Sequence, residues 1–224
     1  MWWPSTLGSN AVSSPKSTLP RSIAVTASIA EAKTALRATI KARRDALPAA
    51  TRADYSARIT QRLLQLDSYR AARSVLAYMP FGSEFDSRAL IDHALAHGKR
   101  LLLPRVERGS HTLALHGVTD LQRDLQPGVW GILEPRPDIT NEMQVSDLEW
   151  ILVPGLVFTP RSKRLGYGAG FYDRLIESCA HNPAQVAAAF EVQVVDELPT
   201  TATDRRVDLV VTERTLYGGE GQHL

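Results

Sequence analysis

The chain has 224 residues, a net charge of +2 and a single cysteine, Cys179. That length allows one α/β domain or two small ones, with roughly 70–75% of the unfolded surface buried on folding. The small net charge gives no reason to expect a nucleic-acid partner, and no run approaches the ~18 apolar residues of a membrane span. A lone cysteine excludes an internal disulfide and fits a reducing compartment, which predicts a cytoplasmic protein.

Residues 1–27 differ in composition from the rest of the chain. They are rich in Ser, Thr and Pro and contain no Asp or Glu. Such a segment cannot bury enough apolar surface to become ordered. We therefore expect a disordered extension over residues 1–27, a folded domain over 28–217 and a frayed tail over 218–224.

The first ordered element is a helix that starts near Ser28. Glu31 follows three residues later, which is the pattern of a capping box. An apolar face with steps of three and four is formed by Ile29, Ala32, Leu36 and Ile40. Another face stacks the cations Lys33, Arg37 and Lys41 at four-residue spacing. From the residues alone, the basic face is best explained as a solvated surface.

The remainder of the chain alternates helical and strand patterns. Helices are predicted over 50–66, with Ile59, Leu63 and Leu66 inward, and over 88–97, where Gly98 ends the helix. Buried or alternating apolar runs predict strands at 75–78, 99–103, 113–118, 150–153, 186–190 and 208–211. This order is typical of an α/β domain with a largely parallel sheet covered by helices.

A loop with two carboxylates, MPFGSEFDS, follows the strand at 75–78. Ligand contacts in open α/β sheets come from loops at the carboxyl ends of strands. Asp86 is explained as a cap of the next helix, but Glu84 is not. Glu84 is therefore the candidate for a functional role.

The stretch from 150 to 174 organises the rest of the chain. A buried strand is followed by a loop with Arg161, Lys163 and Arg164, and then by three alternate glycines at 166, 168 and 170. Helical spacing resumes with Phe171, Leu175, Ile176 and Cys179, which predicts a packed cysteine. Glycine turns, helix N-termini and cations together favour anion binding, although a plain turn remains equally open on spacing alone. Asp173, in the first turn, could stabilise the helix dipole or hold a cation.

The glycine turn matches neither a P-loop nor the dinucleotide fingerprint. The string RLGYGAGFYDR resembles the signature of the 5-formyltetrahydrofolate cyclo-ligase family, also called methenyltetrahydrofolate synthetases. The resemblance covers residues 31–213. It implies a Rossmann-like layered fold and an enzyme that uses ATP and Mg²⁺ to close the formyl group of 5-formyltetrahydrofolate onto the second nitrogen. It also implies a folate partner, with or without a polyglutamate tail, and we expect a monomer without a nucleic-acid or membrane partner.

The resemblance assigns roles to individual residues. In this family a K-x-x-x-R pair on the first helix reaches the ATP phosphates, which favours a phosphate role for Lys33 and Arg37; Lys33 and Arg164 are the catalytic candidates. The implied nucleotide site comprises Lys33, Arg37, Arg164, Leu165, Gly166, Tyr167, Gly168, Ala169, Gly170, Phe171 and Tyr172. The implied folate site comprises Met79, Glu84, Trp130, Tyr167, Gly168, Ala169, Gly170 and Phe171. The implied magnesium ligands are Asp173 and Asp204.

Other positions stay open. Trp130, in PGVWGILEP, either covers the flat ring of the substrate or packs in the core. Glu134 matches the family but receives no role. Thr159 and Ser162 stand where Asp and Gly are usual, so the loop geometry there is uncertain. Read without the family, Asp204 is best explained as a turn residue, and no histidine is expected to bind a metal ion.

Two other functional classes remain possible. One is a sugar-phosphate isomerase or acyl-CoA transferase of similar layering, which would use the glycine loop for phosphate but would need no ATP. The other is a non-catalytic folate-binding protein or an RNA-associated regulator. The set of Lys33, Arg37, Arg164 and Asp173 argues against a protein that has lost catalysis.

Overall fold

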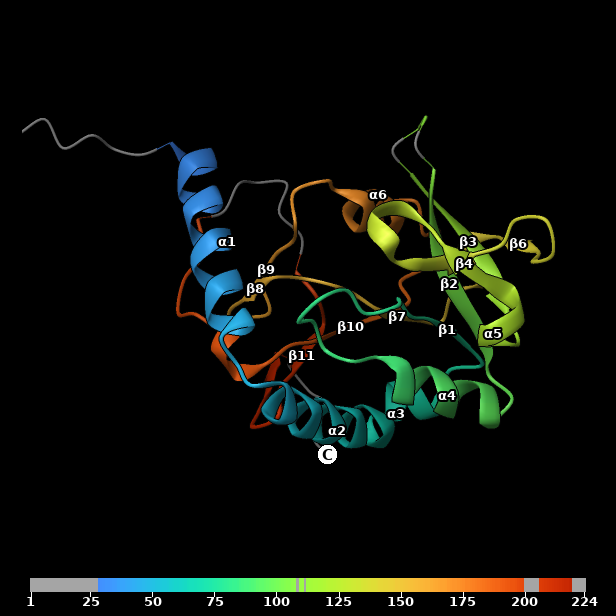
Figure 1. The fold of residues 1–224 in the computed structure, drawn as a ribbon, viewed down its shortest axis with the longest axis horizontal. Helices are drawn as coiled ribbons and strands as arrows, with labels where there is room; N and C mark the ends of the chain where they lie inside the picture. Colours follow the sequence, from blue (N-terminus) through green and yellow to red (C-terminus); the bar gives the residue numbers. More distant parts are fainter. Residues whose placement is uncertain (1–27, 108, 111, 200–205, 219–224) are drawn as a thin grey trace, which may run out of the picture.

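The computed structural model describes residues 28–107, 109–110, 112–199 and 206–218 (Figure 1). The predicted extension over 1–27, Asp204 and residues 219–224 lie outside this range. None of the described helices is long and apolar enough to cross a membrane.

An eight-stranded sheet in the order β12-β11-β10-β7-β1-β2-β3-β6 forms the centre of the fold. Its strands are β1 (Ser74–Leu76), β2 (Arg100–Glu107), β3 (Thr112–Val118), β6 (Glu142–Met143), β7 (Trp150–Leu152), β10 (Ala184–Ala188), β11 (Leu209–Val211) and β12 (Leu216–Gly218). The five central strands, from β11 to β2, run parallel, and β12, β3 and β6 are antiparallel additions at the edges. The predicted α/β class with a largely parallel sheet is confirmed.

The strand order reverses between β1 and β7. These strands are parallel neighbours, but from β1 the chain continues to β2 on one side, and from β7 it continues to β10 and β11 on the other. The carboxyl ends of strands at such a switch point form the crevice in which α/β sheets bind ligands. The loop with Glu84 follows β1, and the loop with Arg164 follows β7, so the topology brings them together.

Helices cover both faces of the sheet. The helices of the described residues are α1 (Ile29–Asp45), α2 (Ala49–Gln65), α3 (Asp67–Ala71), α4 (Arg88–Ala96), α5 (Leu121–Asp124) and α6 (Phe171–Glu177), with 3-10 turns η1 (Val129–Gly131), η2 (Val145–Asp147) and η3 (Glu191–Gln193). Alternate strand residues point to opposite faces. Val75 and Trp150 pack with α2 and α4, whereas Leu76 and Ile151 pack with α6. Figure 1 shows α2, α3 and α4 along one face, with α6 on the other.

Helix α1 stands at one end of the molecule (Figure 1). Its predicted capping box is present: Ser28 N donates to Glu31 Oε2 at 2.7 Å, and Glu31 N donates to Ser28 Oγ at 3.2 Å. Ile40 is fully buried against a small hairpin formed by β8 (Val157–Phe158) and β9 (Arg164–Leu165). A second hairpin outside the sheet joins β4 (Leu125–Pro127) to β5 (Leu133–Pro135).

The predicted strands differ from the structure most clearly at β2, β10 and β12. β2 continues past Pro104 to Glu107 because beyond Leu102 it pairs with β3 alone, and an edge tolerates a residue without an N–H. The strand predicted at 186–190 is β10, two residues earlier at both ends. The short strand β12 was not predicted, and it includes Gly218, where the frayed tail was expected to begin.

Helix α6 ends at Glu177, before Cys179. The last turn tightens, since Cys179 N donates to the Ile176 carbonyl at 3.2 Å, three residues back. Cys179 is nevertheless packed against the apolar face of the sheet, and burial raises the pKa of its thiol. The packing role predicted for this cysteine is confirmed, although it lies beyond the helix.

Candidate active site

A cavity of about 1010 Å³ opens at the carboxyl ends of β1 and β7. Pockets for ligands are typically about 300–1,000 Å³, so this one is at the upper end of that range. One wall is the basic face of α1, where Lys33, Arg37, Lys41 and Arg44 line the cavity in succession. The face predicted to be a solvated surface on residue pattern alone therefore forms a wall of the cavity.

The cavity gathers every described residue predicted for the site. Its lining includes Lys33, Arg37, Met79, Glu84, Trp130, Arg164, Leu165, Gly166, Tyr167, Gly168, Ala169, Gly170, Phe171, Tyr172 and Asp173. These residues come from four separate parts of the chain. Asp204 lies outside the described residues, so its predicted role stays a prediction.

The glycine loop between β9 and α6 forms part of the cavity wall. Gly168 has φ +106° and Gly170 has φ +69°, a backbone region that side chains rarely adopt. Gly170 is also the N-cap of α6. The loop is tied to α1, because Arg37 Nε donates to the Gly166 carbonyl at 2.9 Å. The first helix and the glycine loop thus form one unit.

Arg164 and Asp173, predicted to clamp phosphate and to bind magnesium, are paired with each other. Arg164 Nη2 donates to Asp173 Oδ1, and Arg164 Nη1 donates to the Pro154 carbonyl at 3.0 Å. Arg164 is buried, whereas the Asp173 side chain is 42% exposed. A phosphate group or a cation that used either residue would compete with this ion pair.

Glu84 lies in a cluster with three phenols. Its Oε2 accepts from Phe81 N at 3.1 Å, and its Oε1 accepts from the Tyr167 hydroxyl. Burial first, and the Glu84 carboxylate second, raise the pKa values of Tyr78, Tyr167 and Tyr172. The buried Tyr172 hydroxyl has no hydrogen-bond partner among the described residues. These phenols stay protonated at neutral pH and can donate hydrogen bonds.

Trp130 is not a core residue. Its side chain is 68% exposed and lines the cavity, so the core alternative is excluded. Glu134, which had no predicted role, supports the turn that carries it. Glu134 is buried, and its Oε1 accepts from Val129 N at 3.3 Å. A Cβ on Gly128 would lie 2.3 Å from the Glu134 carboxyl carbon, so a side chain there would displace the Glu134 carboxylate.

Arg44 is a site residue that the sequence analysis missed. It is 3% exposed, donates to Ser83 Oγ and to the Tyr167 hydroxyl, and lines the cavity. It extends the basic face of α1, lying three residues after Lys41. Because residues three or four apart share a face of a helix, this spacing could have placed Arg44 on the basic face from sequence alone.

The comparisons with known proteins agree with this geometry. The model of the 5-formyltetrahydrofolate cyclo-ligase family matches residues 29–213. The chain belongs to this family. It is 28% identical to the 5-formyltetrahydrofolate cyclo-ligase of Mus musculus, over 81% of this chain and 94% of that protein. Identity to the Escherichia coli K12 cyclo-ligase is 29%, over 80% and 98% of the two chains. The NMR structure of Aquifex aeolicus 5,10-methenyltetrahydrofolate synthetase superposes with a TM-score of 0.75 at 31% identity, over 86% and 95% of the chains.

The two departures from the cyclo-ligase signature lie in the β8–β9 turn and leave it intact. Thr159 Oγ1 accepts from Lys163 N at 3.2 Å, so its hydroxyl fixes the turn where an Asp is usual. Ser162 adopts φ +58°, a value that favours the usual Gly. Its hydroxyl donates to the Tyr217 carbonyl at 3.2 Å.

A magnesium site in this cyclo-ligase family member would depend on few protein ligands. Among the described residues no group of three or more His, Cys, Asp or Glu could hold a metal ion. His93, on α4, and His97, the C-cap of that helix, are four residues apart, and their ring centroids stack at 3.8 Å. The sequence analysis overlooked this spacing, but both residues are absent from the cavity lining. Asp173 lines the cavity from the first turn of α6, just after the glycine loop. One carboxylate fits Mg²⁺ held mainly by waters and phosphate oxygens.

Proposed function

We propose that the cavity binds 5-formyltetrahydrofolate and ATP side by side and closes the formyl group to give 5,10-methenyltetrahydrofolate. One observation carries the proposal: a single cavity joins a basic helix face and a glycine loop to a glutamate and an exposed tryptophan. The first pair suits a triphosphate, and the second suits a flat heterocycle with hydrogen-bond donors. Membership of the family supports this pairing.

The reaction has two steps. The formyl oxygen forms a bond to the γ-phosphorus, the bond from that phosphorus to the β-phosphate oxygen breaks, and ADP leaves. The second nitrogen then attacks the activated formyl carbon and loses its proton, and the carbon–oxygen bond breaks to release phosphate. The protein must place the formyl oxygen in line with the γ-phosphate and stabilise the developing charge.

Nucleotide contacts are assigned to α1 and to the glycine loop. Lys33, Arg37 and Arg164 would contact the triphosphate, with backbone N–H groups of residues 165–172 beside it. Asp173, together with Asp204, would hold Mg²⁺, which would neutralise phosphate charge. Because Asp173 pairs with Arg164, binding of the magnesium nucleotide would exchange this ion pair for contacts of each partner with the ligand.

Folate contacts are assigned to the turn after β1 and the β4–β5 hairpin, and to the glycine-loop residues Tyr167, Gly168, Ala169, Gly170 and Phe171, which the nucleotide shares. Glu84 would accept hydrogen bonds from the pterin, Trp130 would cover a flat ring, and Met79 would pack beside it. A polyglutamate tail on the folate is compatible with this arrangement. We further expect a cytoplasmic monomer.

One assay tests the proposal. Purified protein with 5-formyltetrahydrofolate, ATP and Mg²⁺ should develop the absorbance of methenyltetrahydrofolate, and ADP should appear only when the folate is present. Excess chelator should abolish turnover. Turnover without nucleotide would exclude ATP activation, and turnover in chelator would exclude the metal. Folate binding without turnover would favour the non-catalytic alternative.

A further inference from the structure

Arg44 is a buried cation whose described hydrogen bonds go to hydroxyl groups. Burial of a guanidinium is costly unless its N–H groups are satisfied. Nε donates to Ser83 Oγ at 2.9 Å, and Nη1 donates to the Tyr167 hydroxyl at 2.8 Å. Each hydroxyl in turn contacts a carboxylate: Ser83 donates to Asp45, and Tyr167 donates to Glu84. Arg44 thus reaches two anions through two hydroxyls.

This arrangement fixes where the Tyr167 proton points. The phenol oxygen accepts from Arg44, and the Glu84 carboxylate can only accept, so the hydroxyl must donate to Glu84. Burial and the adjacent carboxylate raise the pKa of Tyr167, which keeps that proton in place. The two charged residues, Arg44 and Glu84, therefore set the direction of donation along this chain of hydrogen bonds: Arg44 donates to Tyr167, and Tyr167 donates to Glu84.

The same contacts tie three segments into one assembly. Tyr167 lies in the glycine loop, Glu84 in the turn after β1 and Arg44 in the last turn of α1. Arg37, two helical turns before Arg44, holds the neighbouring Gly166 carbonyl. The Glu84 carboxylate consequently has one donor from its own turn, at Phe81, and one from the glycine loop.

We propose that Arg44 is a positioning residue that orients the Tyr167 hydroxyl, and that through this hydroxyl the glycine loop holds Glu84 in place for the folate. The inference rests on the proposed function. It adds Arg44 to the folate site and states how the glycine loop acts on Glu84, through the Tyr167 hydroxyl. It also separates Arg44 from the other cations of α1: its effect is on folate binding, and it requires Tyr167.

A double-mutant cycle tests this dependence. 5-Formyltetrahydrofolate is titrated calorimetrically into wild type, Tyr167→Phe, Arg44→Gln and the double variant, without ATP. Each single variant should weaken binding about 10-fold, because a hydrogen bond to a charged group is lost or misdirected. The double variant should be no more than about twofold weaker than Tyr167→Phe, because coupled residues are not additive. Factors that multiply to about 100-fold would show that Arg44 acts independently and overturn the inference.

The matched control is Tyr217→Phe. The Tyr217 hydroxyl also donates to a carboxylate, that of Glu191, but both lie outside the cavity lining. This variant should bind folate as wild type does, and weakened binding would overturn the claim that the Tyr167 effect is local. If Arg44→Gln does not fold, Arg44→Lys replaces it, because an ammonium keeps the charge without the planar fork.

Failure of this inference is distinguishable from failure of the proposed function. Wild type that does not bind 5-formyltetrahydrofolate overturns both. Wild type that binds and converts it, with effects of Arg44 and Tyr167 that multiply, overturns only the positioning role.

Discussion

The two small hairpins outside the main sheet use the same unusual backbone state in opposite ways. Among the described residues, Trp130 at φ 57° and Ser162 at φ 58° are the non-glycine residues with positive φ. Trp130 lies between β4 and β5, and Ser162 lies between β8 and β9. Such a conformation is strained for a residue with a Cβ and persists only where its surroundings enforce it.

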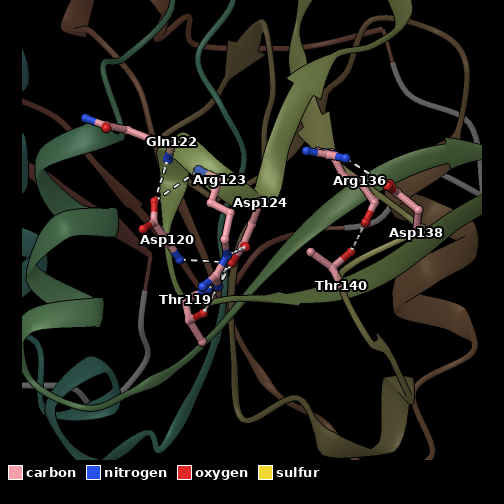
Figure 2. A network of polar contacts seen from close by, with 8 residues as sticks. All are labelled: Thr119, Asp120, Gln122, Arg123, Asp124, Arg136, Asp138 and Thr140. Carbon is pink, nitrogen blue, oxygen red and sulfur yellow. Dashed lines mark hydrogen bonds and ion pairs between the residues drawn. The ribbon is translucent and has the colours of Figure 1, made fainter.

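In the β4–β5 hairpin the strained residue itself lines the cavity, and a set of polar contacts holds the base. Figure 2 shows the polar contacts around that base. Asp124, just before β4, accepts from Thr119 N and Asp120 N at 2.9 Å and from Arg123 Nε at 2.7 Å. Arg136, just after β5, donates its backbone N–H to the Asp124 carbonyl at 2.8 Å. The tip then presents the indole to the cavity.

In the β8–β9 hairpin the strained residue at the tip is buried and anchors the hairpin, and a different residue faces the cavity. Ser162, at the tip, is 4% exposed, and its hydroxyl donates to the Tyr217 carbonyl of β12 at 3.2 Å. Its own carbonyl accepts from Val207 N at 3.0 Å. The proposed phosphate-binding side chain, Arg164, lies at the start of β9. Strain therefore presents a cavity-lining side chain in one hairpin and anchors the hairpin to the main sheet in the other.

The largest effect should come from the partner of Arg164. Asp173→Asn removes the charge that pairs with Arg164 and would hold Mg²⁺, but keeps a polar side chain in the first turn of α6. Loss of a preorganised charge at a reacting phosphoryl group costs on the order of 10²–10³ in rate. We expect a folded, nearly inactive protein whose activity partly recovers at high Mg²⁺, measured by steady-state assay against Mg²⁺ concentration.

Asp54→Asn is the control for this variant. Asp54 also pairs with an arginine, Arg58 at 3.0 Å, but on the exposed surface of α2. An exposed ion pair contributes little, so activity should be unchanged. Normal turnover in well-folded Asp173→Asn would refute both the metal role of Asp173 and the importance of its pair with Arg164.

A smaller effect should come from Asp124, at the base of the β4–β5 hairpin. This effect is on stability and not on catalysis. Asp124→Asn removes a carboxylate that is 2% exposed and accepts from backbone N–H groups. Because Arg123 itself is largely exposed, most of the loss should come from the backbone donors. We expect the free energy of unfolding to fall by about 2–3 kcal/mol, measured by urea denaturation. Turnover at a temperature where both proteins are folded should change less than about twofold, since Asp124 is absent from the cavity lining.

The stability that the Asp124 carboxylate contributes should depend on pH. The Arg123 side chain, and then the backbone N–H groups of Thr119 and Asp120, hold the pKa of Asp124 well below its ordinary value. A depressed folded-state pKa stabilises the protein above the unfolded pKa, and this contribution is lost as pH falls toward the folded value. The stability difference between wild type and Asp124→Asn should therefore be full at pH 6 and shrink below about pH 5. A difference independent of pH would contradict the assignment.

Much of this arrangement could be predicted from sequence because the signals were local. The capping box at Ser28 and Glu31, the apolar strand at 150–153 and the glycine turn depend on neighbouring residues, and the structure contains them. Most site residues were predicted from the family resemblance, since spacing alone left phosphate binding and a plain turn equally open.

What could not be predicted depends on contacts between distant segments. The hydrogen bond from Arg44 to Tyr167 spans 123 residues, and its partners carry no common motif. β12 has three residues, too few for a periodic pattern, and forms because β11 offers an edge. The exposure of Trp130 follows from positive φ at a turn supported by Glu134, which neither composition nor spacing indicates.

The smallest effect should come from the tip of the β8–β9 hairpin, where opposing terms nearly cancel. Ser162→Gly relieves a left-handed conformation that costs roughly 1–2 kcal/mol. It also loses the hydrogen bond to the Tyr217 carbonyl, about 0.5–1.5 kcal/mol, and gives the unfolded chain more freedom, about 0.4–1 kcal/mol. We therefore expect the free energy of unfolding to change by less than about 1 kcal/mol, with normal turnover.

Ser162→Ala separates these terms, because it loses the hydroxyl but keeps the strained backbone. It should be less stable than Ser162→Gly by about 1 kcal/mol, measured by urea denaturation of both variants in parallel. If the alanine variant equalled or exceeded the glycine variant, the backbone at this tip would not be strained. The hairpin would then be anchored by its contacts with Tyr217 and Val207 alone, and its likeness to the strained turn at Trp130 would be only geometric.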